Sequence, residues 1–155
     1  MSAGRVMNRN VVTVLHGTAV SEVVRLMHAS GHGGLPVMDE ESRVLGVATK
    51  LAVLRLCLPQ YADQIGDLSF LPDDFEPFAR RFERAGQVKV EQIMEPCPPC
   101  VSEDTPLAEV ASVMVTRRVR QVPVVREGRL VGIVGLQDVI DEIVRPHVTG
   151  GDTST

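Results

Sequence analysis

The stretch VMNRNVVTVLHGTAVSEVVRLMHASGHGGLPVMDEESRVLGVATKLAVL (6–54) returns in altered form as IMEPCPPCVSEDTPLAEVASVMVTRRVRQVPVVREGRLVGIVGLQDVI (93–140). The offset between matching positions is 87 residues at first and falls to 86 where MDEESRV meets the shorter VREGRL. A turn tolerates a one-residue deletion, so the similarity indicates an internal duplication. The residues that recur are Met7, Val14, Thr18, Glu22, Val23, Met27, Pro36 and Val37, as Met94, Val101, Thr105, Glu109, Val110, Met114, Pro123 and Val124.

Each copy has the pattern of a strand, a helix, two strands and a second helix. Val20, Val23, Val24 and Met27 recur at helical spacing, which predicts a helix with one apolar stripe. We expect Thr18 and Thr105 to be helix N-caps, Pro106 to take the first helical position and Gly31 to be a C-cap. The runs LPVM and VLGVA, like VPVV and LVGIV, predict hairpins. Second helices follow over about 50–58 and 137–144, each ended by a proline.

This pattern predicts an α+β fold of tandem β-α-β-β-α repeats, packed as a pseudo-twofold pair because one unit has too little core alone. We expect repeat 1 over 1–58, repeat 2 over 88–146 and a disordered tail over 147–155. The connecting segment, 59–87, is too long for a plain linker. Its helix, capped by Asp73 or Asp74, would carry one aromatic face, which either packs on its own chain or contacts a partner or second subunit; the face consists of Phe75, Phe78 and Phe82.

Composition excludes several classes of protein. The chain has 155 residues, 44% of them hydrophobic, and a net charge of −4, which gives no indication of general nucleic-acid binding. No apolar run approaches the roughly 18 residues that a membrane span needs, and the N-terminus does not resemble a signal peptide. Three cysteines, an odd number, argue against a disulfide framework. We therefore expect a cytoplasmic protein.

Cys97 and Cys100 have the spacing of a redox motif or of metal ligands. In the repeat alignment they occupy the places of Asn10 and Thr13, in an extended lead-in, whereas a redox cysteine needs a helix N-terminus to lower its pKa. Zinc needs about four ligands, and neither Cys57 nor the four histidines have suitable spacing. A structural role is favoured, with a regulatory disulfide and a metal site as alternatives. Because no nucleophile–base pair or carboxylate dyad is present, we do not expect an enzyme.

The order of these features, occurring twice, resembles the CBS domain, named after cystathionine β-synthase. Two tandem copies resemble a CBS pair, or Bateman module, over about 100 of the 155 residues. The resemblance implies that a cleft between the repeats binds an adenine nucleotide such as AMP, ADP or ATP. It also implies a flat homodimer, for which the aromatic face of the connecting segment is the expected contact.

The family's Gly-x-x-Thr-x-x-Asp motif is split between the repeats. Repeat 1 reads GVATKLA, with Thr49 and Lys50 present but Ala52 in place of the aspartate. Repeat 2 reads GIVGLQD, with Asp138 present but Gly135 in place of the threonine. A carboxylate accepts hydrogen bonds from a ribose diol, and the Gly135 N–H would suit a phosphate. Alternatively, Asp138 only stabilises the first turn of its helix.

By the same resemblance, HASGHGGLP (28–36) and TRRVRQVP (116–123) would face the clefts. Arg118 and Arg120 would contact phosphate, although a solvated charge cluster is equally consistent with their sequence. His32 would stand at the matching place in repeat 1, where an exposed loop histidine is the alternative. Gly33 would permit close approach of the backbone, and the apolar walls would include Val12 and Pro99.

The favoured function is a homodimeric regulatory module that binds an adenine-containing ligand and modulates a partner protein. The first alternative is a ligand-independent interaction scaffold that acts through the helix at 75–82. The second is a thiol sensor that uses Cys97 and Cys100.

Overall fold

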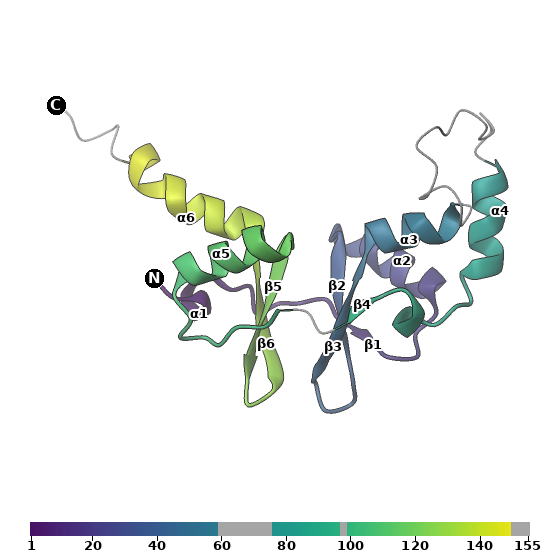
Figure 1. Cartoon of the computed structure of the whole chain (residues 1–155), viewed down its shortest axis with the longest axis horizontal. Coiled ribbons are helices and arrows are strands. Elements are labelled where there is room, and N and C mark those ends of the chain that lie inside the picture. The colour runs from purple at the N-terminus through teal and green to yellow at the C-terminus, as the bar shows by residue number, and fades with distance from the viewer. Residues whose placement is uncertain (59–75, 97–98, 150–155) are drawn as a thin grey trace. The chain divides into compact units, whose positions relative to one another are not determined.

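The computed structural model describes residues 1–58, 76–96 and 99–149 (Figure 1). Contacts between residues divide the chain into two compact units. The N-terminal unit consists of residues 12–40 and 45–96, and the C-terminal unit consists of residues 1–11, 41–44 and 97–155, each within its described part.

The N-terminal unit is built on a four-stranded sheet in the order β1-β2-β3-β4. β1 runs parallel to β2, whereas β4 runs antiparallel to β3. The helix α2 buries Val23 and Met27 in the same core as Leu35 and Val37, as its apolar spacing predicted. The elements are β1 (Val14–Leu15), α2 (Val20–Ser30), β2 (Gly34–Met38), β3 (Val44–Thr49), α3 (Lys50–Cys57), α4 (Glu76–Ala85), the 3-10 helix η1 (Val90–Gln92) and β4 (Glu95–Pro96).

The C-terminal unit is built on an antiparallel hairpin of β5 (Gln121–Arg126) and β6 (Arg129–Gly135), with a register shift between Val124 and Val125. Its helices are α1 (Ala3–Val6), α5 (Leu107–Arg117) and α6 (Leu136–Thr149). Apolar residues of every one of these elements form a single core: Ala3, Met7, Leu107, Val110, Met114, Val122, Val124, Val134 and Val139. The predicted tandem repeat is confirmed.

The lead-in to each repeat packs in the unit of the other repeat, which the sequence did not indicate. Residue 8 forms an antiparallel bridge with Ile133, and Glu95, its counterpart 87 residues later, pairs with Val47. In the same way, Ser2 bridges Pro106 and Lys89 bridges Ala19. The N-terminal segment 1–11 therefore completes the C-terminal unit, and the segment 88–96 completes the N-terminal unit.

A methionine–glycine contact accompanies each exchanged segment. A Cβ atom added to Gly132 would lie 2.6 Å from the Met7 sulfur, and one added to Gly46 would lie 2.7 Å from the Met94 sulfur. Real Cβ atoms do not approach other atoms so closely, so each glycine makes room for a methionine of the other repeat.

Three predicted helix boundaries were wrong. Thr18 does not cap α2, because its hydroxyl donates to the Leu15 carbonyl at 2.6 Å and Ala19 is the N-cap. Thr105 does not cap α5, because Pro106 is the N-cap rather than the first helical residue. α6 continues past residue 146 to Thr149. The C-cap at Gly31 is confirmed, since its φ of 74° is left-handed.

The connecting segment is described only from residue 76 onward, so the predicted caps Asp73 and Asp74 and the aromatic Phe75 lie outside the described residues. α4 packs against α3, with Phe78 and Phe82 half-buried. Among the described helices, none has the length and hydropathy of a bilayer-spanning segment.

Candidate functional site

The β6–α6 junction of the C-terminal unit is closed by the side chain of Asp138. The Gly135 N–H donates a hydrogen bond to Asp138 Oδ2 at 2.8 Å, and the Leu136 N–H donates to the Arg120 carbonyl, also at 2.8 Å. The hairpin register places Gln121 opposite Gly135. Asp138, Gly135 and Arg120, all expected in the site, therefore lie together.

The β3–α3 junction is its counterpart in the N-terminal unit. The Lys50 N–H donates to the Gly33 carbonyl at 3.0 Å, which is the equivalent of the bond from Leu136 to Arg120. Thr49 is the N-cap of α3, and its hydroxyl oxygen accepts from the Ala52 N–H at 3.1 Å. Three expected residues, Gly33, Thr49 and Lys50, are thus brought together here.

Each junction keeps a different half of a reciprocal capping arrangement. In a capping box, the side chain of the N-cap residue accepts a hydrogen bond from the backbone N–H three residues later. The side chain of that later residue accepts in return from the backbone N–H of the N-cap residue. Thr49 makes only the forward bond, and Asp138 makes only the return bond. The bond of Asp138 agrees with the alternative that this residue stabilises the first turn of its helix, and Thr49 also caps its helix.

These bonds decide what each junction still offers to a ligand. The Gly135 N–H, expected to be available for a phosphate, already donates to Asp138, so that expectation was wrong. Within the described chain, Asp138 Oδ1 accepts no hydrogen bond, and a carboxylate has about four acceptor positions in total. The Thr49 hydroxyl keeps its hydrogen for donation, but Ala52 supplies no carboxylate beside it.

Arg118 holds an unusual backbone conformation two residues before Arg120, whose carbonyl accepts a hydrogen bond from the C-terminal junction. It is the C-cap of α5 with a φ of 54°, and it occupies the place that Gly31 takes in the other repeat. A left-handed conformation costs a non-glycine residue about 1 kcal/mol or more. Both Arg118 and Arg120 have exposed side chains.

The other residues that the sequence placed in the site are His32, Val12 and Pro99. His32 is half-buried rather than exposed, and its backbone N–H approaches the Ser30 hydroxyl at 3.4 Å. Val12 packs against the core of the N-terminal unit, and Pro99 is half-buried.

The two described cysteines, Cys57 and Cys100, lack the lowered pKa of a reactive thiol. Desolvation raises the pKa of Cys100, and burial raises the pKa of Cys57, although nearby Arg81 opposes the shift at Cys57. A raised pKa leaves less thiolate at neutral pH. Cys97 lies outside the described residues. Within the described ranges, no three histidine, cysteine or acidic side chains are grouped as a metal site would require.

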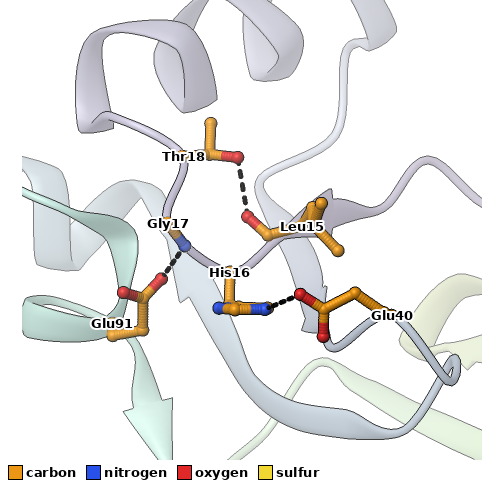
Figure 2. A network of polar contacts seen from close by, with 6 residues as sticks. All are labelled: Leu15, His16, Gly17, Thr18, Glu40 and Glu91. Atoms are coloured by element: carbon orange, nitrogen blue, oxygen red, sulfur yellow. Dashed lines mark hydrogen bonds and ion pairs between the residues drawn. The ribbon is translucent and has the colours of Figure 1, made fainter.

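A polar network between β1, β2 and η1 was not predicted (Figure 2). His16 Nε2 lies 2.5 Å from Glu40 Oε1, and this hydrogen bond raises the pKa of His16. The Gly17 N–H donates to Glu91. In the other repeat the aligned pair is Glu103 with Arg126, an ion pair of reversed polarity. The opposite charges at the aligned positions of the two repeats were the feature of the sequence that could have predicted these pairs.

The comparison with known families agrees with this architecture. The CBS domain model matches residues 3–58 and 90–145, which together make up more than half of the chain. The chain belongs to the CBS domain family and carries two such domains in tandem.

Relatives differ in the share of their own length that matches this chain. A CBS domain-containing protein of Dictyostelium discoideum is 28% identical over 142 residues, covering 91% of this chain and 90% of that protein. Inosine-5'-monophosphate dehydrogenase of Methanocaldococcus jannaschii is 27% identical over 139 residues, covering 89% of this chain but only 23% of the enzyme.

Among solved structures, CBSX2 of Arabidopsis thaliana in complex with AMP has a TM-score of 0.71 and 24% identity. The match covers 94% of this chain and 98% of that chain. At this identity the likeness shows the fold.

Proposed function

We propose that the chain is a regulatory module that binds an adenine nucleotide at the β6–α6 junction, with Asp138 holding the ribose. The observation that carries the proposal is the position of the Asp138 carboxylate, fixed by the Gly135 N–H through one oxygen. The AMP in the structure of CBSX2, a protein of the same fold, supports the choice of ligand.

The chemistry of the junction suits a nucleoside phosphate. The two vicinal hydroxyls of a ribose donate to a carboxylate, and Asp138 Oδ1 has capacity for them. Arg118 and Arg120 lie on the segment that hydrogen-bonds the junction, and guanidinium groups pair well with phosphate oxygens. AMP, ADP and ATP are therefore the ligands to compare.

The split motif argues for one such site rather than two. The N-terminal junction has the hydroxyl of Thr49 and the charge of Lys50, but Ala52 offers no acceptor for a diol. A nucleotide at Thr49 would lose the contact that distinguishes ribose from other groups. Asp138 therefore provides the specific site.

The ligand acts by population shift, not by chemistry on the nucleotide. A ligand that binds one conformation of the pair more tightly than another favours that conformation, and a partner protein that contacts the pair responds. The match to only 23% of a dehydrogenase is consistent with a module that is combined with separate catalytic domains.

A thermal-shift titration with AMP, ADP and ATP tests the nucleotide site. A ligand present at about 100 times its Kd stabilises a protein by about 2.7 kcal/mol, so the melting temperature should rise. Asp138→Ala should abolish the rise. The matched control is Asp141→Ala, about one helical turn further along α6, where the carboxylate accepts a hydrogen bond from Gln137. No rise in the parent protein, or an equal rise in Asp138→Ala, contradicts the proposal.

A second copy of the chain covers the exposed apolar stripe of α6. Ile143 is 57% exposed, and its neighbours on the stripe are also exposed hydrophobic residues: Leu136, Ile140 and Val144. Packing of two such stripes against each other would bury both, which stabilises a dimer by about 25 cal/mol for each Å² of apolar surface buried. Phe78 and Phe82, the contact expected from the sequence, are half-buried and offer less apolar surface.

Sedimentation equilibrium distinguishes the two contacts. Ile143→Glu should shift a dimer toward monomer, because it places a charge in the apolar interface. Val115→Glu, at a solitary residue of α5 that is 79% exposed, should leave the dimer intact. A dimer lost with Phe78→Glu but retained with Ile143→Glu would assign the interface to α4 instead.

A further inference from the structure

A hollow on the N-terminal unit brings together arginines from two helices. Its volume is about 780 Å³, and its walls come from α3, α4, η1 and β4. α3 contributes Arg55, and α4 contributes Arg81 and Arg84, which are three residues apart and therefore neighbours on one helical face. The described residues of its walls all belong to one unit, and none of them is a residue of the β6–α6 junction.

The charges of these arginines are only partly compensated within the described chain. Arg80, on the same helix, pairs with Glu76 at 2.7 Å, whereas no ion pair of Arg55, Arg81 or Arg84 is found among the described residues. Among the described residues that line the hollow, Glu95 is the acidic one, so the arginines outnumber it. The positive field reaches Cys57, whose pKa Arg81 lowers against the opposing effect of burial.

Guanidinium groups that line one hollow without an ion-pair partner among the described residues repel one another, and a multivalent anion bound between them would remove that repulsion. The planar donors of arginine match phosphate oxygens, with two hydrogen bonds from one group. Beside the charges lies an apolar surface formed by Leu56, Ala85 and Ile93. A ligand with a phosphorylated end and an apolar body fits both parts of the hollow.

We propose that this hollow, the α3–α4 groove, is a second anion site that binds a small phosphorylated molecule through Arg55, Arg81 and Arg84. The site is independent of the nucleotide site at Asp138, because it lies in the other unit and contains no residue of that junction. Its ligand needs at least two negative charges to match three arginines and one glutamate.

Isothermal titration calorimetry with inorganic pyrophosphate tests the site in the full chain at low ionic strength. We expect a binding event that is weakened at least tenfold in Arg81→Gln and in Arg84→Gln. Arg80→Gln is the matched control, because it removes an arginine of the same helix that lies outside the hollow. Its affinity should be unchanged, as should that of Asp138→Ala.

Three results would overturn the proposal. The first is the absence of pyrophosphate binding, and the second is an equal loss of affinity in Arg80→Gln, which would indicate a diffuse charge effect. The third is a loss of thermal stability in Arg81→Gln and Arg84→Gln without any effect of pyrophosphate. That result would assign the arginines to carboxylates of the chain itself, such as those of the acidic sequence 59–75.

Discussion

At the scale of single residues, two glycines decide whether an exchanged segment can approach its sheet. A Cβ atom on Gly46 would meet the Glu95 carbonyl oxygen at 2.6 Å in addition to the Met94 side chain. On Gly132, the nearest atoms belong to the flexible side chain of Met7, and the nearest backbone oxygen is 3.0 Å away. A methionine can move aside, but a backbone carbonyl in a strand pair cannot move without breaking the pair.

We therefore expect Gly46→Ala to be the more damaging of the two substitutions. Overpacking of this kind costs about 1 to 3 kcal/mol, and Gly46→Ala should lie at the upper end. Gly33→Ala is the control, since its added Cβ would meet only the Lys50 side chain at 3.9 Å. Urea unfolding measures the three free energies. If Gly46→Ala and Gly33→Ala unfold at the same urea concentration, the close packing of β4 on β3 is wrong.

Arg118 carries strain that the proposed function explains. Glycine takes a left-handed conformation without the steric cost that arginine has. Arg118→Gly should therefore raise the free energy of unfolding by about 0.5 to 1 kcal/mol, since part of the relief is offset by the greater freedom of the unfolded chain. The same variant should bind AMP more weakly. A less stable Arg118→Gly, or one with full AMP affinity, would contradict this account.

At the scale of elements, the polar network joins strand ends rather than filling the core. His16 follows β1, Glu40 follows β2 and Glu91 belongs to η1, so the network links three segments of the N-terminal unit (Figure 2). The Glu40 hydrogen bond is the main cause of the raised pKa of His16, and the charges of Glu91 and Asp39 add to it. The pKa of Glu40 is lowered, first by its own backbone N–H and then by His16.

This pair predicts a pH window for stability. A raised histidine pKa gives stability that is complete below the unfolded value of 6.5 and is lost as pH rises through the folded value. A lowered Glu40 pKa gives stability above the unfolded value of 4.5, which is lost at lower pH. The melting temperature of His16→Gln should therefore differ from that of the parent most between these two values.

A double-mutant cycle with Glu40→Gln checks the pair. The second substitution should add no pH-dependent loss to that of His16→Gln, because either change removes the same hydrogen bond. An equal deficit of His16→Gln at pH 5.5 and pH 8.5 would show that the histidine acts through packing alone.

The sequence predicted the existence of the elements better than their ends. The apolar spacing of Val20, Val23 and Met27 identified α2, since burial of one stripe stabilises a helix whatever caps it. The N-cap at Thr18 failed because a hydroxyl can bond locally in more than one way, and here it bonds the preceding Leu15 carbonyl. Local hydrogen-bond choices of this kind depend on the tertiary path of the chain.

At the scale of the whole molecule, the exchange of lead-in segments was not predictable from the repeat itself. Met7 and Met94 are equivalent, as are Gly46 and Gly132, so the sequence pattern is the same whether a methionine packs on its own repeat or on the other one. In the structure each packs on the glycine of the other repeat. The split motif, in contrast, could be recognised from single residues. Thr49 makes the forward bond of a capping box at α3, and Asp138 makes the return bond at α6.

The exchange predicts a crossed response to mutation. Met7→Ala should loosen the C-terminal unit, because Met7 belongs to the core that includes Leu107 and Val134, whereas Met94→Ala should loosen the N-terminal unit. Each should cost about 2 to 5 kcal/mol, with the partly buried Met94 at the lower end. Native-state hydrogen exchange measures where protection falls. Faster exchange in β2 and β3 for Met7→Ala, with β5 and β6 unaffected, would contradict the exchanged arrangement.

The most direct test of the proposed function is a ¹H–¹⁵N correlation spectrum of the full chain titrated with AMP. The Gly135 N–H donates to the carboxylate proposed to hold the ribose, so its resonance should move with the Leu136 resonance and saturate. In Asp138→Ala the same titration should leave both amides in place. A saturating titration in which these two amides stay fixed while others move, or in which no amide moves, would contradict nucleotide binding at Asp138.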